Sequence, residues 1–190
     1  QSLAEITSRI VMNLQPIIDE FKPELILVHG DTSTTFCSAL CAYYNQIQIG
    51  HVEAGLRTGN IYSPWPEEAN RKLVSCITKY HFAPTHEAQQ NLIRENVNEN
   101  DTFITGNNVI DALFLISEKI YNQESIKTEL KKSFPMLHEQ RKMILITGHR
   151  RENFGDGFQR ICRSIQILAE ANPKVDFIYP VHLNPKVREP

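Results

Sequence analysis

The sequence predicts an α/β fold in which parallel β-strands alternate with helices. Short, continuously apolar runs such as 25–28 and 143–146 are typical of parallel strands that are covered on both faces. Segments with apolar residues three or four positions apart, typical of amphipathic helices, lie between these runs. This alternation predicts parallel sheets with right-handed crossovers. A break at 106–108 places a domain junction near Asn107, which divides the chain into 1–106 and 107–190.

The first half of the chain begins with an amphipathic helix. Apolar residues recur at helical spacing from Leu3 to Phe21, and Pro23 ends the pattern. The apolar run that follows predicts a strand at 24–29, buried on both faces. A helical pattern then predicts a helix at 32–44, and a second apolar run predicts a strand at 46–53.

The segment 54–66 is expected to be a loop because it contains two Gly and two Pro residues. Pro66 suits the first turn of a following helix, where Glu67 and Glu68 interact favourably with the helix dipole. Next come a strand ended by Pro84 and a helix capped by Thr85 that runs to about residue 96.

The remaining elements follow the same order. The patterns predict a strand at 102–105, a helix from Val109, a Lys-rich and mainly helical stretch at 122–142, a strand at 143–148, a helix at about 156–171 and a strand at 175–180.

Composition excludes several classes of function. The 20 Lys and Arg residues balance 22 Asp and Glu residues, so the net charge of −2 offers no general field for nucleic acid or an anionic membrane. The apolar runs are too short to span a bilayer. The four cysteines form no CxxC pair, and Cys37 and Cys41 are expected to be small buried apolar side chains, with redox or metal-binding roles as the alternative. The absence of a signal peptide predicts a cytoplasmic location.

The two ends predict that this chain is an internal segment of a longer polypeptide. It begins with Gln1 rather than Met, and it ends at Pro190 soon after an expected strand.

Polar side chains gather where the expected strands end. Asp31 follows one apolar strand and Glu53 ends the next, and the carboxyl ends of parallel strands form the edge of the sheet at which ligands bind. Each has a structural alternative: Asp31 as a helix N-cap, and Glu53 as an ion-pair partner of Arg57. Glu67 suits a first helical turn, and Arg71, one turn later, would pair with Glu67 or hold a ligand phosphate.

The segment Thr147–Asn153 repeats this arrangement in the second half of the chain. His149, Arg150 and Arg151 follow an expected strand and suit a diphosphate, because guanidinium groups match phosphate oxygens and imidazole can donate a proton. Surface charge is the alternative. His182 also stands at a strand end, where a structural histidine and a ligand-binding one are equally compatible with the pattern.

Six motifs in order make the resemblance to a known family specific. HGDTSTT, GHVEAGLRTG, SPWPEEANR, TGNNVIDAL, TGHRREN and YPVHLNP resemble the non-hydrolysing UDP-N-acetylglucosamine 2-epimerases, in particular the bacterial type that serves surface-polysaccharide and enterobacterial common antigen synthesis. The resemblance implies two Rossmann-like domains in an arrangement like that of type B glycosyltransferases. In this chain, 1–106 would lack the first strand–helix unit, and 107–190 would be the first part of the second domain.

The resemblance also implies a reaction and its participants. The family interconverts UDP-N-acetylglucosamine and UDP-N-acetylmannosamine through elimination of UDP and its return to 2-acetamidoglucal, without a metal or another cofactor. By motif, Asp31, Glu53, Glu67 and His149 match the catalytic residues. Asp31, Glu53, Arg71, His149 and Arg150 would bind substrate, and Glu67, Arg150 and His182 would contribute to a regulatory second site. The full-length enzyme is expected to be a cytoplasmic homodimer.

Two other functions are compatible with the same motifs. A hydrolysing relative would release free N-acetylmannosamine and UDP, and a non-catalytic fragment would only bind a nucleotide sugar. Because the resemblance places part of the nucleotide site outside this chain, residues 1–190 alone are expected to be inactive.

Overall fold

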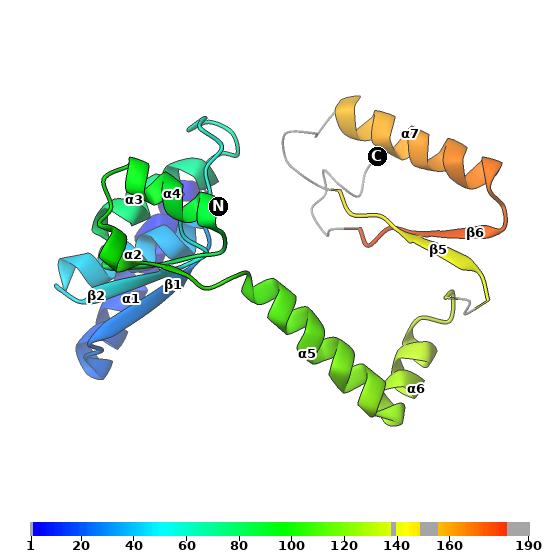
Figure 1. Cartoon of the computed structure of the whole chain (residues 1–190), viewed down its shortest axis with the longest axis horizontal. Helices are drawn as coiled ribbons and strands as arrows, with labels where there is room; N and C mark the ends of the chain where they lie inside the picture. Colours follow the sequence, from blue (N-terminus) through cyan, green and yellow to red (C-terminus); the bar gives the residue numbers. More distant parts are fainter. Residues whose placement is uncertain (1, 138–139, 149–155, 182–190) are drawn as a thin grey trace. The chain divides into compact units, whose positions relative to one another are not determined.

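The computed structural model describes residues 2–137, 140–148 and 156–181, which form two compact units (Figure 1). The first unit extends to Leu113 and the second begins at Phe114. The elements of the first unit are α1 (Leu3–Phe21), β1 (Leu25–His29), α2 (Ser33–Tyr44), β2 (Gln48–Val52), α3 (Glu67–Ile77), β3 (Tyr80–Ala83), α4 (His86–Arg94), η1 (Glu99–Asp101) and β4 (Thr102–Ile104).

Four parallel strands form the sheet of the first unit, in the order β1-β2-β3-β4. Each strand is followed by a helix or a long connection, so all four carboxyl ends lie at one edge of the sheet. The predicted α/β fold class with parallel sheets is confirmed.

Local signals explain where the helices begin and end. Ser2 and Glu5 form a capping box at the start of α1, and Lys22 ends that helix in a left-handed conformation just before Pro23. The Thr85 side chain accepts a hydrogen bond from the backbone of Ala88 and caps α4, as predicted.

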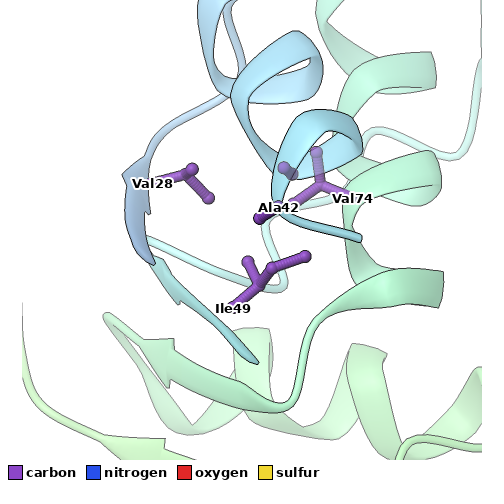
Figure 2. Packing of buried hydrophobic residues seen from close by; sticks show 5 residues of the cluster. Val28, Ala42, Ile49 and Val74 are labelled. Atoms are coloured by element: carbon purple, nitrogen blue, oxygen red, sulfur yellow. The ribbon is translucent and has the colours of Figure 1, made fainter. Parts of the chain in front are cut away.

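The core of the first unit lies between the sheet and its helices (Figure 2). Val28 of β1 and Ile49 of β2 point toward Ala42 of α2 and Val74 of α3, and all four side chains are buried. Burying an aliphatic side chain of this size contributes roughly 1.5–3 kcal/mol. The cluster therefore fixes α2 and α3 on the sheet, and α3 carries several of the residues described below.

The prediction that both faces of β1 are buried is wrong for the part of the chain that the structure describes. Val28 is buried, whereas Leu25 and Leu27 are 41% and 61% exposed. β1 is the first strand of the sheet, and its helices cover only one of its faces over these residues. The apolar run identified the strand, but its neighbours decide how much of it is covered.

The second unit contains a two-stranded parallel sheet. Its elements are α6 (Glu124–Ser133), β5 (Lys142–Leu145), α7 (Asp156–Ala171) and β6 (Val175–Ile178), while α5 (Asn108–Asn122) spans the boundary between the units. Phe158 of α7 is buried and lies near Tyr179. The boundary at Leu113 falls within α5, so a domain junction near Asn107 stays a prediction.

Two further expectations concern the cysteines and the membrane. Cys37 and Cys41 are buried in α2, and all four cysteines are free. None of the helices in the described ranges is long and apolar enough to cross a bilayer.

Candidate active site

The carboxyl ends of β1 and β2 bring Asp31 and Glu53 to the same edge of the sheet. The strands pair in parallel with His29 opposite Val52, and the backbone N–H of Gly30 donates to the carbonyl of Val52 at 3.0 Å. Asp31 follows Gly30, and Glu53 follows Val52. The structure therefore places both carboxylates where ligands bind in open α/β sheets.

Glu53 has an unusual backbone conformation for a residue with a β-carbon. Its φ angle is 67°, in the left-handed region, which costs roughly 1–2 kcal/mol for residues other than glycine. Such strain concentrates at functional sites. Glu53 Oε2 lies 3.5 Å from Nε2 of His29 and 3.4 Å from the position that a β-carbon on Gly30 would occupy. The Glu53 carboxylate thus lies against the end of β1.

Asp31 is held by α3 through both its main chain and its side chain. Asp31 Oδ2 accepts hydrogen bonds from Arg71 Nε at 3.0 Å and Nη2 at 2.5 Å, and the Asp31 carbonyl accepts one from Asn70 Nδ2 at 2.8 Å. The N-cap of α2 is Thr32, whose side chain accepts from the backbone N–H of Thr35. The alternative in which Asp31 is a helix N-cap is therefore wrong.

Glu68 is a completely buried carboxylate on α3, with 0% of its surface exposed. Its Oε1 accepts hydrogen bonds from the backbone N–H groups of Thr58 at 3.1 Å and Gly59 at 3.2 Å, and its Oε2 accepts one from Arg71 Nη1 at 3.1 Å. A buried charge is tolerated only with partners of this kind. Glu68 thus joins the loop after β2 to Arg71.

Arg71 pairs with Asp31 and Glu68, rather than with Glu67 as one of the two predicted roles required. Its side chain is 14% exposed. Glu67 starts α3 as predicted and is half-buried, and within the described residues its carboxylate has no hydrogen bond or ion pair. Within the described residues, the Glu67 carboxylate is therefore available to bind a ligand.

Arg57 is not the partner of Glu53. Its Nη2 lies 2.7 Å from Oε2 of Glu95 and donates at 3.0 Å to the hydroxyl of Ser75. The hydrogen bond and charge of Arg57 lower the pKa of Glu95, which burial partly opposes. The structural alternative for Glu53, an ion pair with Arg57, is wrong, because Arg57 instead pairs with Glu95 at the end of α4.

Two buried histidines lie side by side beneath this edge, because His51 of β2 is in register with His81 of β3. His51 Nε2 donates to the carbonyl of Gly30 at 2.7 Å, so it supports the turn before Asp31. Burial lowers the pKa of His51, and burial together with His51 lowers that of His81 to about 4. Both rings are thus neutral at neutral pH.

The other predicted site residues, His149, Arg150 and His182, lie outside the described residues. Their catalytic, substrate-binding and regulatory roles stay predictions. Within residues 2–137, 140–148 and 156–181, no three His, Cys, Asp or Glu side chains are grouped as a metal ion would need.

Sequence reasoning missed the roles of three residues in this network: Glu68, Asn70 and His51. Glu68 was assigned only to the helix dipole, yet Glu68 and Arg71 are three positions apart on a helix, a spacing that predicts contact. Asn70 and His51 bond to main-chain carbonyls of the Gly30–Asp31 turn, and no local pattern indicates such partners.

Comparisons with known proteins agree with the motifs. The model of the family UDP-N-acetylglucosamine 2-epimerase matches residues 1–190. The chain is 53% identical to UDP-N-acetylglucosamine 2-epimerase of Salmonella typhimurium and 49% identical to that of Campylobacter jejuni, with 100% of this chain and 50% of each relative covered. The chain thus spans about half the length of the curated relatives it matches.

Solved structures show the same likeness. UDP-GlcNAc 2-epimerase from Neisseria meningitidis bound to UDP-GlcNAc matches with a TM-score of 0.95 at 49% identity, over 100% of this chain and 51% of that one. The Methanocaldococcus jannaschii enzyme in complex with UDP-GlcNAc and UDP matches with a TM-score of 0.80 at 29% identity, over 100% and 50%. The predicted resemblance is confirmed, and the chain belongs to the UDP-N-acetylglucosamine 2-epimerase family.

Proposed function

We propose that the full-length protein interconverts UDP-N-acetylglucosamine and UDP-N-acetylmannosamine by a non-hydrolysing route. A carboxylate removes the proton from C2 of the sugar while the bond between C1 and the UDP oxygen breaks, which gives 2-acetamidoglucal and UDP. UDP then adds back to C1, and a second carboxyl group, acting as an acid, protonates C2 from the opposite face. The electron pair of the C2–H bond becomes the C1–C2 double bond and returns to a C2–H bond, so the reaction needs no external oxidant or reductant.

The observation that carries this proposal is the placement of Asp31 and Glu53 at adjoining strand ends. Epimerisation at C2 needs a base and an acid at one carbon, and general acid–base groups must lie within hydrogen-bonding reach of it. In the described residues, Asp31 Oδ1 has no hydrogen-bond partner, and His29 is the one polar partner of the Glu53 carboxylate. Two carboxylates at one ligand-binding edge thus each keep an oxygen available for a substrate.

Glu67 and His149 complete the proposed set. Glu67, at the start of α3 and without a partner in the described part of the chain, would position the sugar. His149 and Arg150 would stabilise the diphosphate as it leaves and returns, because preorganised donors act most strongly where charge develops. Arg71 would contribute to the substrate site through Asp31, and Glu67, Arg150 and His182 would form a regulatory second site.

Isotope exchange tests this proposal directly. The full-length protein, incubated in heavy water with UDP-N-acetylglucosamine, is expected to incorporate deuterium at C2 of both nucleotide sugars, as measured by NMR and mass spectrometry. Free N-acetylmannosamine with UDP would instead identify a hydrolysing enzyme. Binding without exchange would identify a binding module, and either result would overturn the proposal.

Single substitutions assign the carboxylates. Asp31→Asn and Glu53→Gln are each expected to lower kcat for exchange by roughly 10²–10⁴-fold, the usual contribution of a general acid or base. Glu24→Gln is the control, because Glu24 is an exposed carboxylate that precedes β1, at the opposite edge of the sheet. Normal exchange in either site variant would remove that residue from proton transfer.

The proposal extends to the cellular setting. The full-length enzyme would be a cytoplasmic homodimer that supplies UDP-N-acetylmannosamine for bacterial surface polysaccharide, including enterobacterial common antigen. Cell fractionation and light scattering of the purified protein test location and assembly. A gene deletion that leaves the surface polysaccharide unchanged would contradict the proposed pathway.

A further inference from the structure

Glu68 is the most deeply buried charged group of the described chain, and all three of its hydrogen bonds are with residues next to the candidate site. One oxygen holds the backbone N–H groups of Thr58 and Gly59, in the loop that begins at Glu53. The other accepts from Arg71. A buried carboxylate with a full set of donors keeps one geometry, because any other arrangement would leave a buried polar group unpaired.

Arg71 transmits this geometry to Asp31. The planar guanidinium group meets two carboxylates, with Nη1 on Glu68 and both Nε and Nη2 on Asp31. The donors of a guanidinium are fixed relative to one another, so the position of Glu68 sets the direction from which Arg71 approaches Asp31. Both contacts fall on Oδ2 of Asp31, which leaves Oδ1 as the oxygen without a partner among the described residues.

The main chain of Asp31 is fixed from the same helix. Asn70, 7% exposed, donates to the Asp31 carbonyl at 2.8 Å. The backbone turn and the carboxylate of Asp31 are therefore both attached to one turn of α3, which Glu68 attaches in turn to the loop after β2.

We propose that Glu68 is a positioning residue for the epimerisation: it holds Arg71 so that Arg71 orients the Asp31 carboxylate, with Oδ1 presented to the substrate. This inference rests on the proposed function. It gives neighbouring glutamates different roles, because Glu67 is half-buried without a partner in the described chain, whereas Glu68 is fully buried and acts through Arg71.

The first test is Glu68→Gln in the full-length enzyme. The amide oxygen can still accept from Thr58 and Gly59, but the amide nitrogen then faces Arg71 donor to donor, so Arg71 loses its fixed position. We expect kcat for C2 exchange to fall about 10²-fold, the effect of misplacing a reacting group by about 1 Å, while KM changes less than about threefold.

A double-mutant cycle with Asp31→Asn separates positioning from a general structural effect. If Glu68 acts through Asp31, Glu68→Gln has no further effect on kcat once Asp31 is Asn, so the double variant matches Asp31→Asn alone. Independent effects that multiply would overturn the inference.

Glu95→Gln is the matched structural control. It also removes the carboxylate partner of a largely buried arginine, Arg57, but its hydrogen bonds and ion pairs are with Arg57 and Lys72 rather than with Asp31 or Arg71. We expect this variant to unfold at lower urea concentration and to keep the kcat of the wild-type enzyme. A fall in kcat equal to that of Glu68→Gln would overturn the inference, because loss of stability alone would then explain both.

Arg71→Lys provides a second variant should Glu68→Gln not fold. Lysine keeps the positive charge between the two carboxylates but lacks the fork that orients Asp31, so kcat is again expected to fall without an added effect in Asp31→Asn. If the wild-type enzyme does not exchange deuterium at C2, the proposed function and this inference are both overturned. Exchange in the wild type with normal kcat in Glu68→Gln and Arg71→Lys would overturn the inference alone.

Discussion

At the scale of single residues, Glu53 combines a strained backbone with a carboxylate aimed at the neighbouring strand end. The left-handed φ of 67° lets the chain turn out of β2 while the carboxylate stays beside Gly30 and His29. A glycine would adopt this conformation without strain. The presence of a glutamate there indicates that the side chain, rather than the turn, is what the position requires.

Glu53→Gly and Glu53→Ala separate these two contributions. Both variants lack the carboxylate and should lose exchange activity. Because alanine keeps the left-handed strain, Glu53→Gly is expected to be more stable than Glu53→Ala by about 1 kcal/mol in free energy of unfolding. Urea denaturation of residues 1–190, followed by the fluorescence of Trp65, the only tryptophan among them, measures the difference. Equal stability would show that the backbone of Glu53 is unstrained.

The buried histidines predict a pH-dependent stability. Burial and the neighbouring His51 lower the pKa of His81 from 6.5 to about 4 in the folded state. As the pH falls, His81 therefore takes up a proton in the unfolded chain at a higher pH than in the folded one. The contribution of neutral His81 to stability is fully present above pH 6.5 and is lost as the pH falls from 6.5 to about 4. Between pH 7.5 and 5 the expected loss from His81 is about 2 kcal/mol.

His81→Gln tests this expectation. Between pH 7.5 and 5, the free energy of unfolding of this variant should decrease by about 2 kcal/mol less than that of the wild type. The exposed His86, at the start of α4, supplies the control His86→Gln. Parallel pH curves for the wild type and His81→Gln would contradict the prediction.

At the scale of elements, the loop after β2 depends on close packing against α4. Gly55 has a φ of +87°, and a β-carbon there would collide with the backbone carbonyl of Ala88. Asn91 Nδ2 also donates to the Gly55 carbonyl at 3.1 Å. α4 therefore supports the chain two residues beyond Glu53, and the absence of a side chain at Gly55 permits that contact.

Gly55→Ala is expected to destabilise the first unit by about 3 kcal/mol, the sum of left-handed strain and a clash with main-chain atoms. Gly59→Ala is the matched control, because Gly59 also has a positive φ, +78°, but a β-carbon there would meet no atom within 4 Å. The control should lose only about 1–2 kcal/mol. Chemical denaturation compares the two, and equal losses would show that packing against Ala88 does not matter.

At the scale of the whole molecule, the two units differ in how much core they possess. Phe158 is the one buried hydrophobic residue in the described part of the second unit, whereas the first unit contains a continuous cluster around Val28 and Ile49. Because burial of apolar surface is the main favourable term in folding, we expect the first unit of this chain to be the more stable one.

Hydrogen exchange measured on residues 1–190 tests this difference. β1 and β5 each pair with one other strand in the described chain, so they are matched in backbone hydrogen bonding. Amides of β1 are expected to exchange at least about tenfold more slowly than those of β5. Equal protection would indicate that the two units unfold as one cooperative structure.

The sequence by itself determined the order of strands and helices and the edge of the sheet at which Asp31 and Glu53 both lie. Apolar runs, helical spacing and the Pro and Thr boundaries are local signals, and parallel strands bring their carboxyl ends to one edge whatever the details of packing. The motifs also identified the family. His149, Arg150 and His182 stay predictions of the sequence alone.

Only the tertiary structure decided the partners within the site. Arg71 and Asp31 are 40 positions apart, and Asn70 and Asp31 are 39 apart. The packing of α3 against α2 and β2 brings them together, and no local propensity encodes that distance. The same applies to the exposure of β1, to the left-handed backbone of Glu53 and to the burial of Glu68. Each of these depends on which neighbours surround a residue, which is set by the three-dimensional arrangement of the elements rather than by their identity.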